Sequence, residues 1–198
     1  EKSTPNRPAN ETQKKKEKKK KSVKEPAEAE DAASIFGVMD VRVGLIVDAW
    51  AHESAEKLYC EKIDVGEEQP RTIASGLRAF YDVTDIKGRK VLVFANLKAR
   101  TMSGFKSEGM VLCASSDDHA TVKFLDPPAD AVPGTRVALE GLDNKDAATA
   151  SQVQKKKLLE KLLPSLRTNA DGLACCDGKV FTLPQGPVSA PLPAAAIG

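Results

Sequence analysis

The feature that most restricts the fold is a series of short strand-like segments between residues 41 and 115. Apolar and polar residues alternate from Val41 to Val47, as is typical of a strand with one buried face. A short helix is expected over Ala79–Thr84. The other segments of strand character are Leu58–Gly66, Arg71–Leu77, Lys90–Leu97 and Gly109–Ser115. Five short strands, turns that contain glycine and one intervening helix predict a mainly β protein built on a small five-stranded barrel of the oligonucleotide-binding type, an OB fold.

The pattern changes after residue 135. One short strand is expected at Arg136–Leu139, and Ser151 with Gln154 has the spacing of a capping box that would begin a helix ending near Leu163. Asp177–Gly178 is typical of a hairpin turn. The apolar face of the helix comprises Val153, Leu158, Leu159, Leu162 and Leu163, and its lysines are Lys155, Lys156, Lys157 and Lys161. These features predict a small α+β domain over residues 136–198, after an OB-fold domain over residues 33–135.

Residues 1–32 have the composition of a disordered linker, rich in Lys, Glu, Ala and Pro and poor in large apolar residues. Residues 1–30 carry ten Lys and Arg against six Asp and Glu, a net charge of +4, which leaves −2 for the rest of a chain whose total is +2. The block from Lys14 to Lys24 is either a solvated spacer or an arm that makes non-specific phosphate contacts. The lysines expected to make such contacts are Lys14, Lys15, Lys16, Lys18, Lys19, Lys20 and Lys21.

The sequence contains no motif for catalysis, metal binding or membrane insertion. Its four cysteines form no C-x-x-C pair, and its two histidines lie in no recognisable motif. We expect buried thiols in a reducing compartment, no metal, no cofactor and no catalytic activity in the chain itself. No apolar run approaches the ~20 residues that a membrane span requires, so no membrane partner is expected.

A basic stretch between two predicted strands is the main functional signal. From Lys87 to Lys106 there are six basic residues and no acidic one. Lys and Arg form charge-assisted hydrogen bonds with phosphates, and Met102 and Phe105 offer apolar surfaces on which an unstacked base could lie. The stretch therefore indicates nucleic-acid binding, or else a solvated loop whose Met and Phe close the end of the barrel.

These segments resemble a known family. The stretches "DVRVGLIVDAWAHESAEKLYCEKIDVGE", "RTIASGL" and "NLKARTMSGFKSEGMVLCASS" resemble the tRNA-binding domain shared by the endothelial monocyte-activating polypeptide family and stand-alone tRNA-binding proteins. The same domain is appended to some methionyl- and tyrosyl-tRNA synthetases. "VPGTRV", "KKKLLEKLLPSLRTNADGLACCDGKVF" and "GPV" resemble the C-terminal extension of the longer members.

The resemblance implies tRNA binding near the outer corner of the L-shaped molecule, without anticodon specificity. Lys98 and Arg100 would contact phosphates, Asn96 and Ser107 would hydrogen-bond the RNA backbone or a base edge, and Met102 would pack on a base. The family's H-P-D-A-D-K-L-Y pattern is kept only in part at residues 52–59, and Ser103 stands where a basic residue usually follows the methionine. The complete set of predicted tRNA-binding residues is Asn96, Lys98, Arg100, Met102, Lys106, Ser107, Lys87, Arg89, Lys57 and Ser75.

The resemblance also implies partners and an oligomeric state. We expect the chain to support an aminoacyl-tRNA synthetase or a multisynthetase complex in the cytoplasm, in cis or in trans, by raising its affinity for tRNA. The extension would pack on the barrel as a substitute for a second subunit, a pseudo-dimer that leaves the chain monomeric. Two alternatives remain: a released cytokine-like polypeptide acting through the segment Arg42–Ile46, and a scaffold that docks on a synthetase without contacting RNA.

Overall fold

The computed structural model describes residues 31–198. The predicted linker lies almost entirely outside the described residues, together with its block of lysines. Regular structure is already present before the predicted start near Ile35, because Asp31 caps a helix and accepts a 2.7 Å hydrogen bond from the Ser34 backbone. In chain order the elements are α1 (Ala32–Val38), β1 (Val41–Ala51), β2 (Tyr59–Asp64), β3 (Arg71–Ser75), α2 (Val83–Ile86), β4 (Lys90–Phe94), β5 (Arg100–Met102), β6 (Phe105–Ser107), β7 (Met110–Val111), β8 (Cys113–Ser115), β9 (Val122–Phe124), β10 (Ala138–Leu139), α3 (Ala150–Lys156), α4 (Leu158–Leu162), a 3-10 turn η1 (Leu163–Ser165), β11 (Leu166–Thr168), β12 (Ala174–Cys176), β13 (Lys179–Leu183), β14 (Gly186–Pro187) and β15 (Ala196–Ile197).

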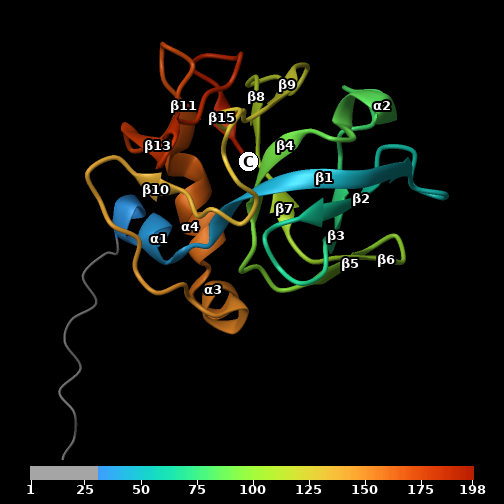
Figure 1. The fold of residues 1–198 in the computed structure, drawn as a ribbon, viewed down its shortest axis with the longest axis horizontal. Helices are drawn as coiled ribbons and strands as arrows, with labels where there is room; N and C mark the ends of the chain where they lie inside the picture. Colours follow the sequence, from blue (N-terminus) through green and yellow to red (C-terminus); the bar gives the residue numbers. More distant parts are fainter. Residues whose placement is uncertain (1–30) are drawn as a thin grey trace, which may run out of the picture.

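The first sheet is an antiparallel, nearly closed barrel with the strand order β3-β2-β1-β4-β7 (Figure 1). Its ends meet where the Glu108 N–H donates a 2.8 Å hydrogen bond to the carbonyl of Thr72. The Thr72 hydroxyl donates a further 3.0 Å hydrogen bond to the carbonyl of Lys106. The structure confirms the predicted mainly β, OB-like barrel.

The long strand β1 bends so that it can pair with two neighbours. Its first half pairs with β4 and its second half with β2, and the β2 register shifts between Ile46 and Asp48. This bulge leaves Val47 on the outside at 39% exposure. Bulges of this kind increase local twist, which a small barrel requires. Gly44 lies just before the bend, where an added Cβ would come within 2.6 Å of the Ile63 side chain.

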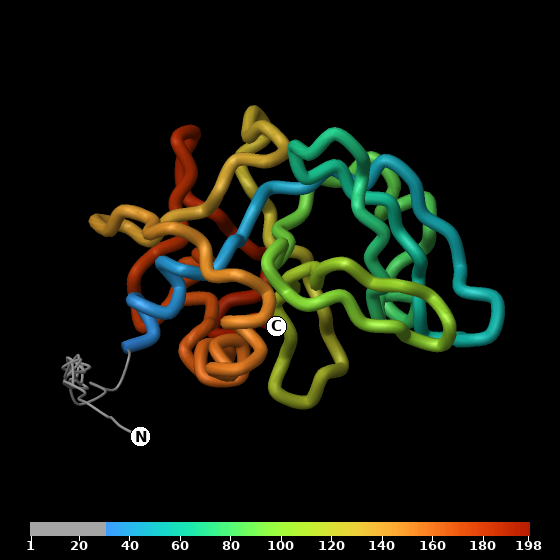
Figure 2. Tube along the Cα trace, turned by 90° about the horizontal axis from the view of Figure 1, so that it is seen from below, coloured from blue at the N-terminus to red at the C-terminus, as the bar shows by residue number. Residues whose placement is uncertain are grey.

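The second sheet is also curled and joins the middle of the chain to its end. Its order is β10-β13-β12-β11-β15-β8-β9, with β14 paired to β13. Gly198 exchanges two backbone hydrogen bonds with Cys113, of 2.9 and 3.0 Å. Figure 2 shows the barrel segments on one side, the C-terminal segments on the other, and the chain end between them.

The fifth predicted strand, Gly109–Ser115, is divided between the two sheets. β7 stays in the barrel, whereas β8 pairs with β15 and β9 in the second sheet. The second sheet therefore recruits strands that precede residue 136, and the division of the chain at residues 135 and 136 stays a prediction. The predicted helix at Ala79–Thr84 lies further along, as α2.

Two hydrophobic cores share the strands β1 and β4. Val91 and Val93 face the inside of the barrel, whereas Leu92 and Phe94 face a second core that includes α1, α4 and the second sheet. Both faces of β4 are therefore buried, which explains the continuous apolar run at Lys90–Leu97. The second core buries Val153, Leu158 and Leu162, and Leu159 and Leu163 pack against its edge, as the predicted apolar helix face requires.

The predicted helix over residues 151–163 differs from the structure at its start and in its middle. Its capping box is Thr149 with Gln152, two residues earlier than predicted, and the Thr149 backbone donates a 2.8 Å hydrogen bond to the Gln152 side chain. Thr149 and Ser151 both have a Gln three residues later, so spacing alone did not separate them. Lys157 adopts a left-handed conformation, with φ of 53° and ψ of 44°, and divides the helix into α3 and α4.

Asp177 and Gly178 form the predicted hairpin turn, both with positive φ. The four cysteines are unpaired and buried. Within residues 31–198, no cluster of three or more metal-binding side chains occurs, and no helix is long and apolar enough to cross a membrane.

Candidate nucleic-acid interface

The basic loop is a β-hairpin. Strands β5 and β6 pair antiparallel, from Arg100 opposite Ser107 to Met102 opposite Phe105. Ser103 and Gly104 form the turn with φ values of 49° and 88°, the left-handed conformations that a two-residue hairpin turn uses. The sequence predicts a loop here, whereas the structure forms two strands that are only three residues long and largely exposed. We refer to residues 96–108 as the basic hairpin.

Arg71 on β3 fixes both ends of the basic hairpin. One guanidinium nitrogen, Nη1, donates to the carbonyl of Ala95 and, at 3.0 Å, to the carbonyl of Glu108. The carboxylate of Glu67 holds the guanidinium in place through hydrogen bonds of 2.6 and 2.8 Å. The hydrogen bonds from Arg71 lower the pKa of Glu67, so this carboxylate stays ionised. The hairpin therefore projects from a fixed base.

Asn96 has a structural role that the sequence analysis did not predict. Its side-chain carbonyl accepts a 3.0 Å hydrogen bond from the Asp40 N–H. Its amide nitrogen donates to the carbonyls of Val38, at 3.2 Å, and Ala148, at 2.9 Å. Both amide hydrogens are used in this way, so Asn96 has no donor left for the RNA contact expected of it.

Ser107 and Ser75 are also engaged within the protein. The Ser107 hydroxyl accepts a 3.0 Å hydrogen bond from the Ala74 N–H and donates to the carbonyl of Gly109 at 3.1 Å. The Ser75 hydroxyl donates to Glu61 Oε1 at 2.6 Å. Both serines are buried, and both hydroxyls have hydrogen-bond partners within the protein.

The predicted cations fall into two groups. Three have carboxylate partners: Lys87 with Asp48 at 3.0 Å, Arg89 with Asp126 at 2.6 Å, and Lys106 with Glu108 at 2.6 Å. Hydrogen bonds from Lys87 and Lys106 lower the pKa values of Asp48 and Glu108. The others are Lys57, Lys98 and Arg100, which are exposed and form no ion pair with the described residues.

The six basic residues of the sequence run do not gather at one place. Lys87 and Arg89 follow α2, which Figure 1 shows on the opposite side of the barrel from β5 and β6. The Arg89 guanidinium also lies 4.7 Å from the centre of the Phe124 ring, a contact within the fold. Lys98 and Arg100 are the two cations of the run that remain available on the hairpin.

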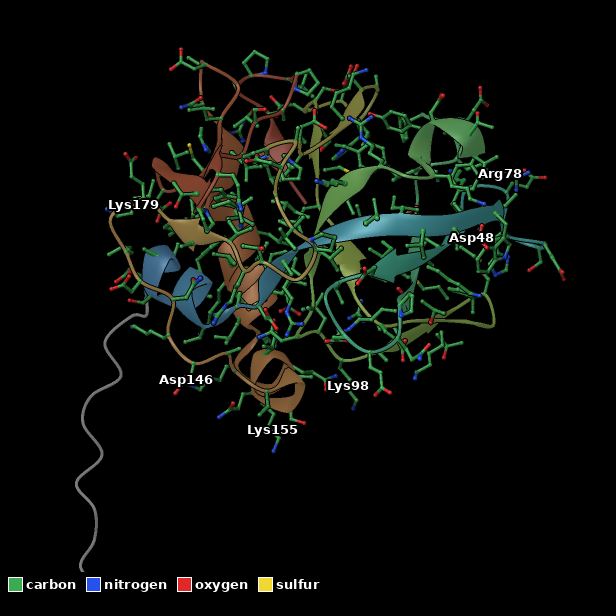
Figure 3. All side chains as sticks on the ribbon, in the orientation of Figure 1. Asp48, Arg78, Lys98, Asp146, Lys155 and Lys179 are labelled. Carbon is green, nitrogen blue, oxygen red and sulfur yellow. The ribbon has the colours of Figure 1, made fainter. Side chains whose placement is uncertain are left out.

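A groove of about 700 Å³ opens beside these two cations, between the barrel and the helices α3 and α4. Figure 3 shows Lys98 beside α3 and Lys155 on the outer side of that helix. The groove has the volume range of small-ligand sites. The predicted residues that line it are Ser75, Lys98, Arg100, Met102 and Ser107, and the C-terminal segments add Val153, Gln154, Leu159, Glu160 and Gly198.

Glu61 lies behind the groove. It is fully buried on the inner face of β2, and its Oε1 accepts the hydrogen bond from Ser75, which lines the groove. Its other oxygen, Oε2, has no hydrogen-bond partner among the described residues. Burial raises the pKa of Glu61 to about 7, against the smaller lowering effect of the Ser75 hydrogen bond. Alternation along the predicted strand Leu58–Gly66 puts Glu61 on the same face as Tyr59, Ile63 and Val65, but gives no sign that a carboxyl would be buried there.

An aromatic contact supports the outer part of the hairpin. The Trp50 and Phe105 rings meet edge to face with centroids 6.0 Å apart, and His52 approaches the same Phe105 ring at 6.4 Å. Phe105 is half-buried, and its ring packs the hairpin against Trp50 of β1. Met102 remains exposed at the groove, at 37%.

Residues 41–136 match a family model described as a putative tRNA binding domain. A probable methionine–tRNA ligase of Oryza sativa subsp. japonica is 43% identical over 148 residues, 75% of this chain and 18% of that protein. The aminoacyl tRNA synthase complex-interacting multifunctional protein 1 of Cricetulus griseus is 37% identical over 171 residues, 86% of this chain and 46% of that protein. This chain spans less than half the length of either relative.

A solved structure matches both parts of the fold. The C-terminal domain of Plasmodium vivax p43 is 34% identical, with a TM-score of 0.77, over 82% of this chain and 98% of that one. OB folds bind oligonucleotides and oligosaccharides. The chain belongs to the family of C-terminal tRNA-binding domains found in endothelial monocyte-activating polypeptide-like proteins and in some aminoacyl-tRNA synthetases.

Proposed function

We propose that this chain binds tRNA through the basic hairpin and the adjoining groove, and that it raises the tRNA affinity of an aminoacyl-tRNA synthetase in cis or in trans. The observation that carries the proposal is the pair Lys98 and Arg100. They are exposed, lie on a hairpin with a fixed base, and form no ion pair within residues 31–198. Unpaired cations gain most from a phosphate, because no existing ion pair has to be broken.

The proposed mode of binding follows from which side chains of the site have no partner among the described residues. Lys98 and Arg100 contact backbone phosphates, which carry no sequence information. Met102 offers an apolar surface to a base, and Lys57 supplies a further cation on the β1–β2 loop. Asn96, Ser75 and Ser107 act by holding the surface in shape. The chain accordingly recognises the shape and backbone of tRNA rather than its sequence. The lysines of residues 14–21 add non-specific phosphate contacts.

We further propose that the chain is a cytoplasmic monomer. The second core buries Val153, Leu158 and Leu162 together with residues of α1, β1 and β4, so most of the apolar helix face is covered within one chain. Leu159 and Leu163, the rest of that face, are half-buried at the edge of this core and leave little apolar surface for self-association. Sedimentation at increasing protein concentration tests the proposal, because a dimer would show a rising mass.

No observation favours the cytokine-like alternative. Its segment, Arg42–Ile46, lies in the first half of β1 with Val43 and Ile46 fully buried. The Arg42 guanidinium is held by the carboxylates of Asp40, at 2.7 Å, and Glu67, at 3.1 Å.

The test is a double substitution, Lys98→Ala with Arg100→Ala, assayed by filter binding to total tRNA at several salt concentrations. Each phosphate contact contributes about 0.7–0.9 to the slope of log affinity against log salt. The double variant should therefore bind many tRNAs more weakly and show a slope flatter by roughly 1 to 2 units. The variant Lys161→Ala with Lys179→Ala removes the same charge from exposed sites that do not line the groove.

The comparison should be repeated with a chain that begins at Asp31, so that the lysines of the N-terminal segment cannot mask the effect. Equal losses in the two double variants would show that only total charge matters. Unchanged binding after loss of Lys98 and Arg100 would show that the basic hairpin is not the site.

A further inference from the structure

The groove beside the basic hairpin has two chemically different walls. The barrel wall carries the cations Lys98 and Arg100, whereas the opposite wall, formed by α3 and α4, carries Gln154 and Glu160. Neither of these two side chains forms a hydrogen bond or ion pair with another described residue. Apolar side chains lie between the walls, among them Leu97, Met110, Val153 and Leu159.

A phosphate would fit only one of these walls. Lys98 and Arg100 attract it, and the Glu160 carboxylate repels it. Carboxylates and side-chain amides instead match the edges of nucleobases: a carboxylate accepts from an exocyclic amino group, and a Gln both donates to and accepts from adenine. The groove therefore has an orientation, with the RNA backbone on the barrel side and a base edge on the side of α3 and α4.

We propose that the groove holds one unpaired nucleotide of the RNA, with its phosphate at Lys98 and Arg100 and its base inserted toward Gln154 and Glu160. This inference rests on the proposed function and assigns a specific role to the C-terminal extension. In that role, α3 and α4 supply the groups that contact the base, in addition to covering the barrel.

The size and lining of the groove favour an unpaired base over a duplex. Within a duplex, the Watson–Crick edges are occupied and the faces are stacked on neighbouring bases. An unstacked base exposes both, and proteins recognise such bases by apolar packing on the face and hydrogen bonds at the edge. The apolar side chains between the walls can cover a base face, and about 700 Å³ accommodates a nucleotide.

Gln154 and Glu160 also predict a preference among the bases. Adenine and cytosine carry an exocyclic amino group that Glu160 can accept from, whereas uracil carries a carbonyl oxygen at the equivalent place. Adenine and cytosine should therefore be preferred over uracil. This base preference would come from the extension and not from the barrel. The phosphate-binding cations of the barrel would not produce it alone, because phosphates carry no sequence information.

The experiment uses the full chain and measures fluorescence anisotropy with single-stranded oligo(A), oligo(C) and oligo(U) of equal length, and with an RNA duplex. Wild type should bind oligo(A) and oligo(C) at least about fivefold more tightly than oligo(U), and the duplex most weakly at matched salt. Gln154→Ala and Glu160→Gln should each reduce the ratio over oligo(U) and leave the salt slope unchanged, because neither removes a phosphate contact.

Lys155→Ala is the matched control, since Lys155 is exposed on α3 and lies outside the groove. It should leave the ratio unchanged. The inference is overturned if wild type shows no preference, if the duplex binds best, if Gln154→Ala and Glu160→Gln keep the wild-type ratio, or if Lys155→Ala lowers it equally. If Gln154→Ala and Glu160→Gln keep the wild-type ratio while Lys98→Ala with Arg100→Ala still weakens tRNA binding, the inference is wrong and the proposed function stands. Absence of tRNA binding by wild type would instead remove the proposed function.

Discussion

The amide nitrogen of Asn96 donates a 2.9 Å hydrogen bond to the carbonyl of Ala148, which joins the first residue of the basic hairpin to the segment before α3. These residues are separated by 52 positions in the sequence. Because the same side chain also binds Val38 and Asp40, one residue links the hairpin, α1 and the C-terminal extension. The two walls of the groove are therefore fixed relative to each other by a contact within the protein.

Replacing Asn96 should accordingly reduce stability before it reduces RNA affinity. Asn96→Ala removes three hydrogen bonds at a partly buried position, each worth on the order of 1 kcal/mol, so the free energy of unfolding should fall by about 2–4 kcal/mol. Lys98 is two residues away and exposed, so Lys98→Ala should change the free energy of unfolding by less than about 0.5 kcal/mol. Urea unfolding followed by circular dichroism gives both values. Unchanged stability of Asn96→Ala together with lost tRNA binding would restore the direct RNA contact predicted from the sequence.

The barrel could be predicted from the sequence because its strands carry local signals. The run from Val91 to Ala95 is apolar throughout, since β4 is buried on both faces, and the Asp177–Gly178 turn has its own backbone preference. The division of Gly109–Ser115 between two sheets could not be predicted, because it depends on pairing with β15 more than 80 residues later. The basic hairpin was missed for a related reason: its strands are exposed and three residues long.

The sequence named several residues that lie at the candidate site, but it did not show which of them already have partners within the protein. Lys98, Arg100 and Met102 do line one groove. Basic residues in a sequence give no indication of which already have partners, and Lys106 and Lys87 are paired with carboxylates at 2.6 and 3.0 Å. Neither Arg71 nor the wall formed by α3 and α4 was identified, because each reaches the hairpin only through the tertiary fold.

The left-handed residue between α3 and α4 offers a second test. Lys157 has φ of 53°, a conformation that costs a non-glycine residue about 1–2 kcal/mol and costs glycine little. Lys157→Gly should therefore raise the melting temperature, whereas Lys155→Gly, inside α3, should lower it by weakening the helix. Thermal unfolding of the two variants checks the prediction. If both substitutions are destabilising to the same extent, the helix is continuous through Lys157.

The shared second core predicts a single unfolding transition. Leu162 is fully buried among residues of α1, β1 and the second sheet, and Leu162→Ala should destabilise the chain by about 2–5 kcal/mol. Trp50, the single tryptophan, lies at the far end of β1 and reports on the barrel by its fluorescence. Fluorescence and circular dichroism should shift together in the variant. A barrel transition that stays at the wild-type position would show that the extension unfolds independently.

The buried carboxyl of Glu61 predicts a pH dependence of stability with an unusual sign for an acidic residue. Burial raises its pKa in the folded chain to about 7, from an ordinary value of 4.5, so the folded state holds this proton more tightly than the unfolded state does. The contribution of Glu61 to stability is therefore fully present below about pH 4.5 and is lost as the pH rises toward 7. The full change is on the order of 3 kcal/mol, from 1.36 kcal/mol for each unit of pKa difference.

Glu61→Gln isolates this effect, because it keeps the shape of the side chain and removes its titration. The free energy of unfolding of Glu61→Gln, minus that of wild type, should rise by about 3 kcal/mol between pH 4.5 and pH 8, measured by urea denaturation at each pH. Taking the difference cancels the contributions to the free energy of unfolding from carboxylates that titrate alike in both proteins. Ser75→Ala supplies the opposite change, since its lost hydrogen bond favoured the ionised form, and it should steepen the fall in stability with pH. A difference between Glu61→Gln and wild type that stays constant from pH 4.5 to pH 8 would mean that Glu61 is charged in the folded chain and that water reaches its second oxygen.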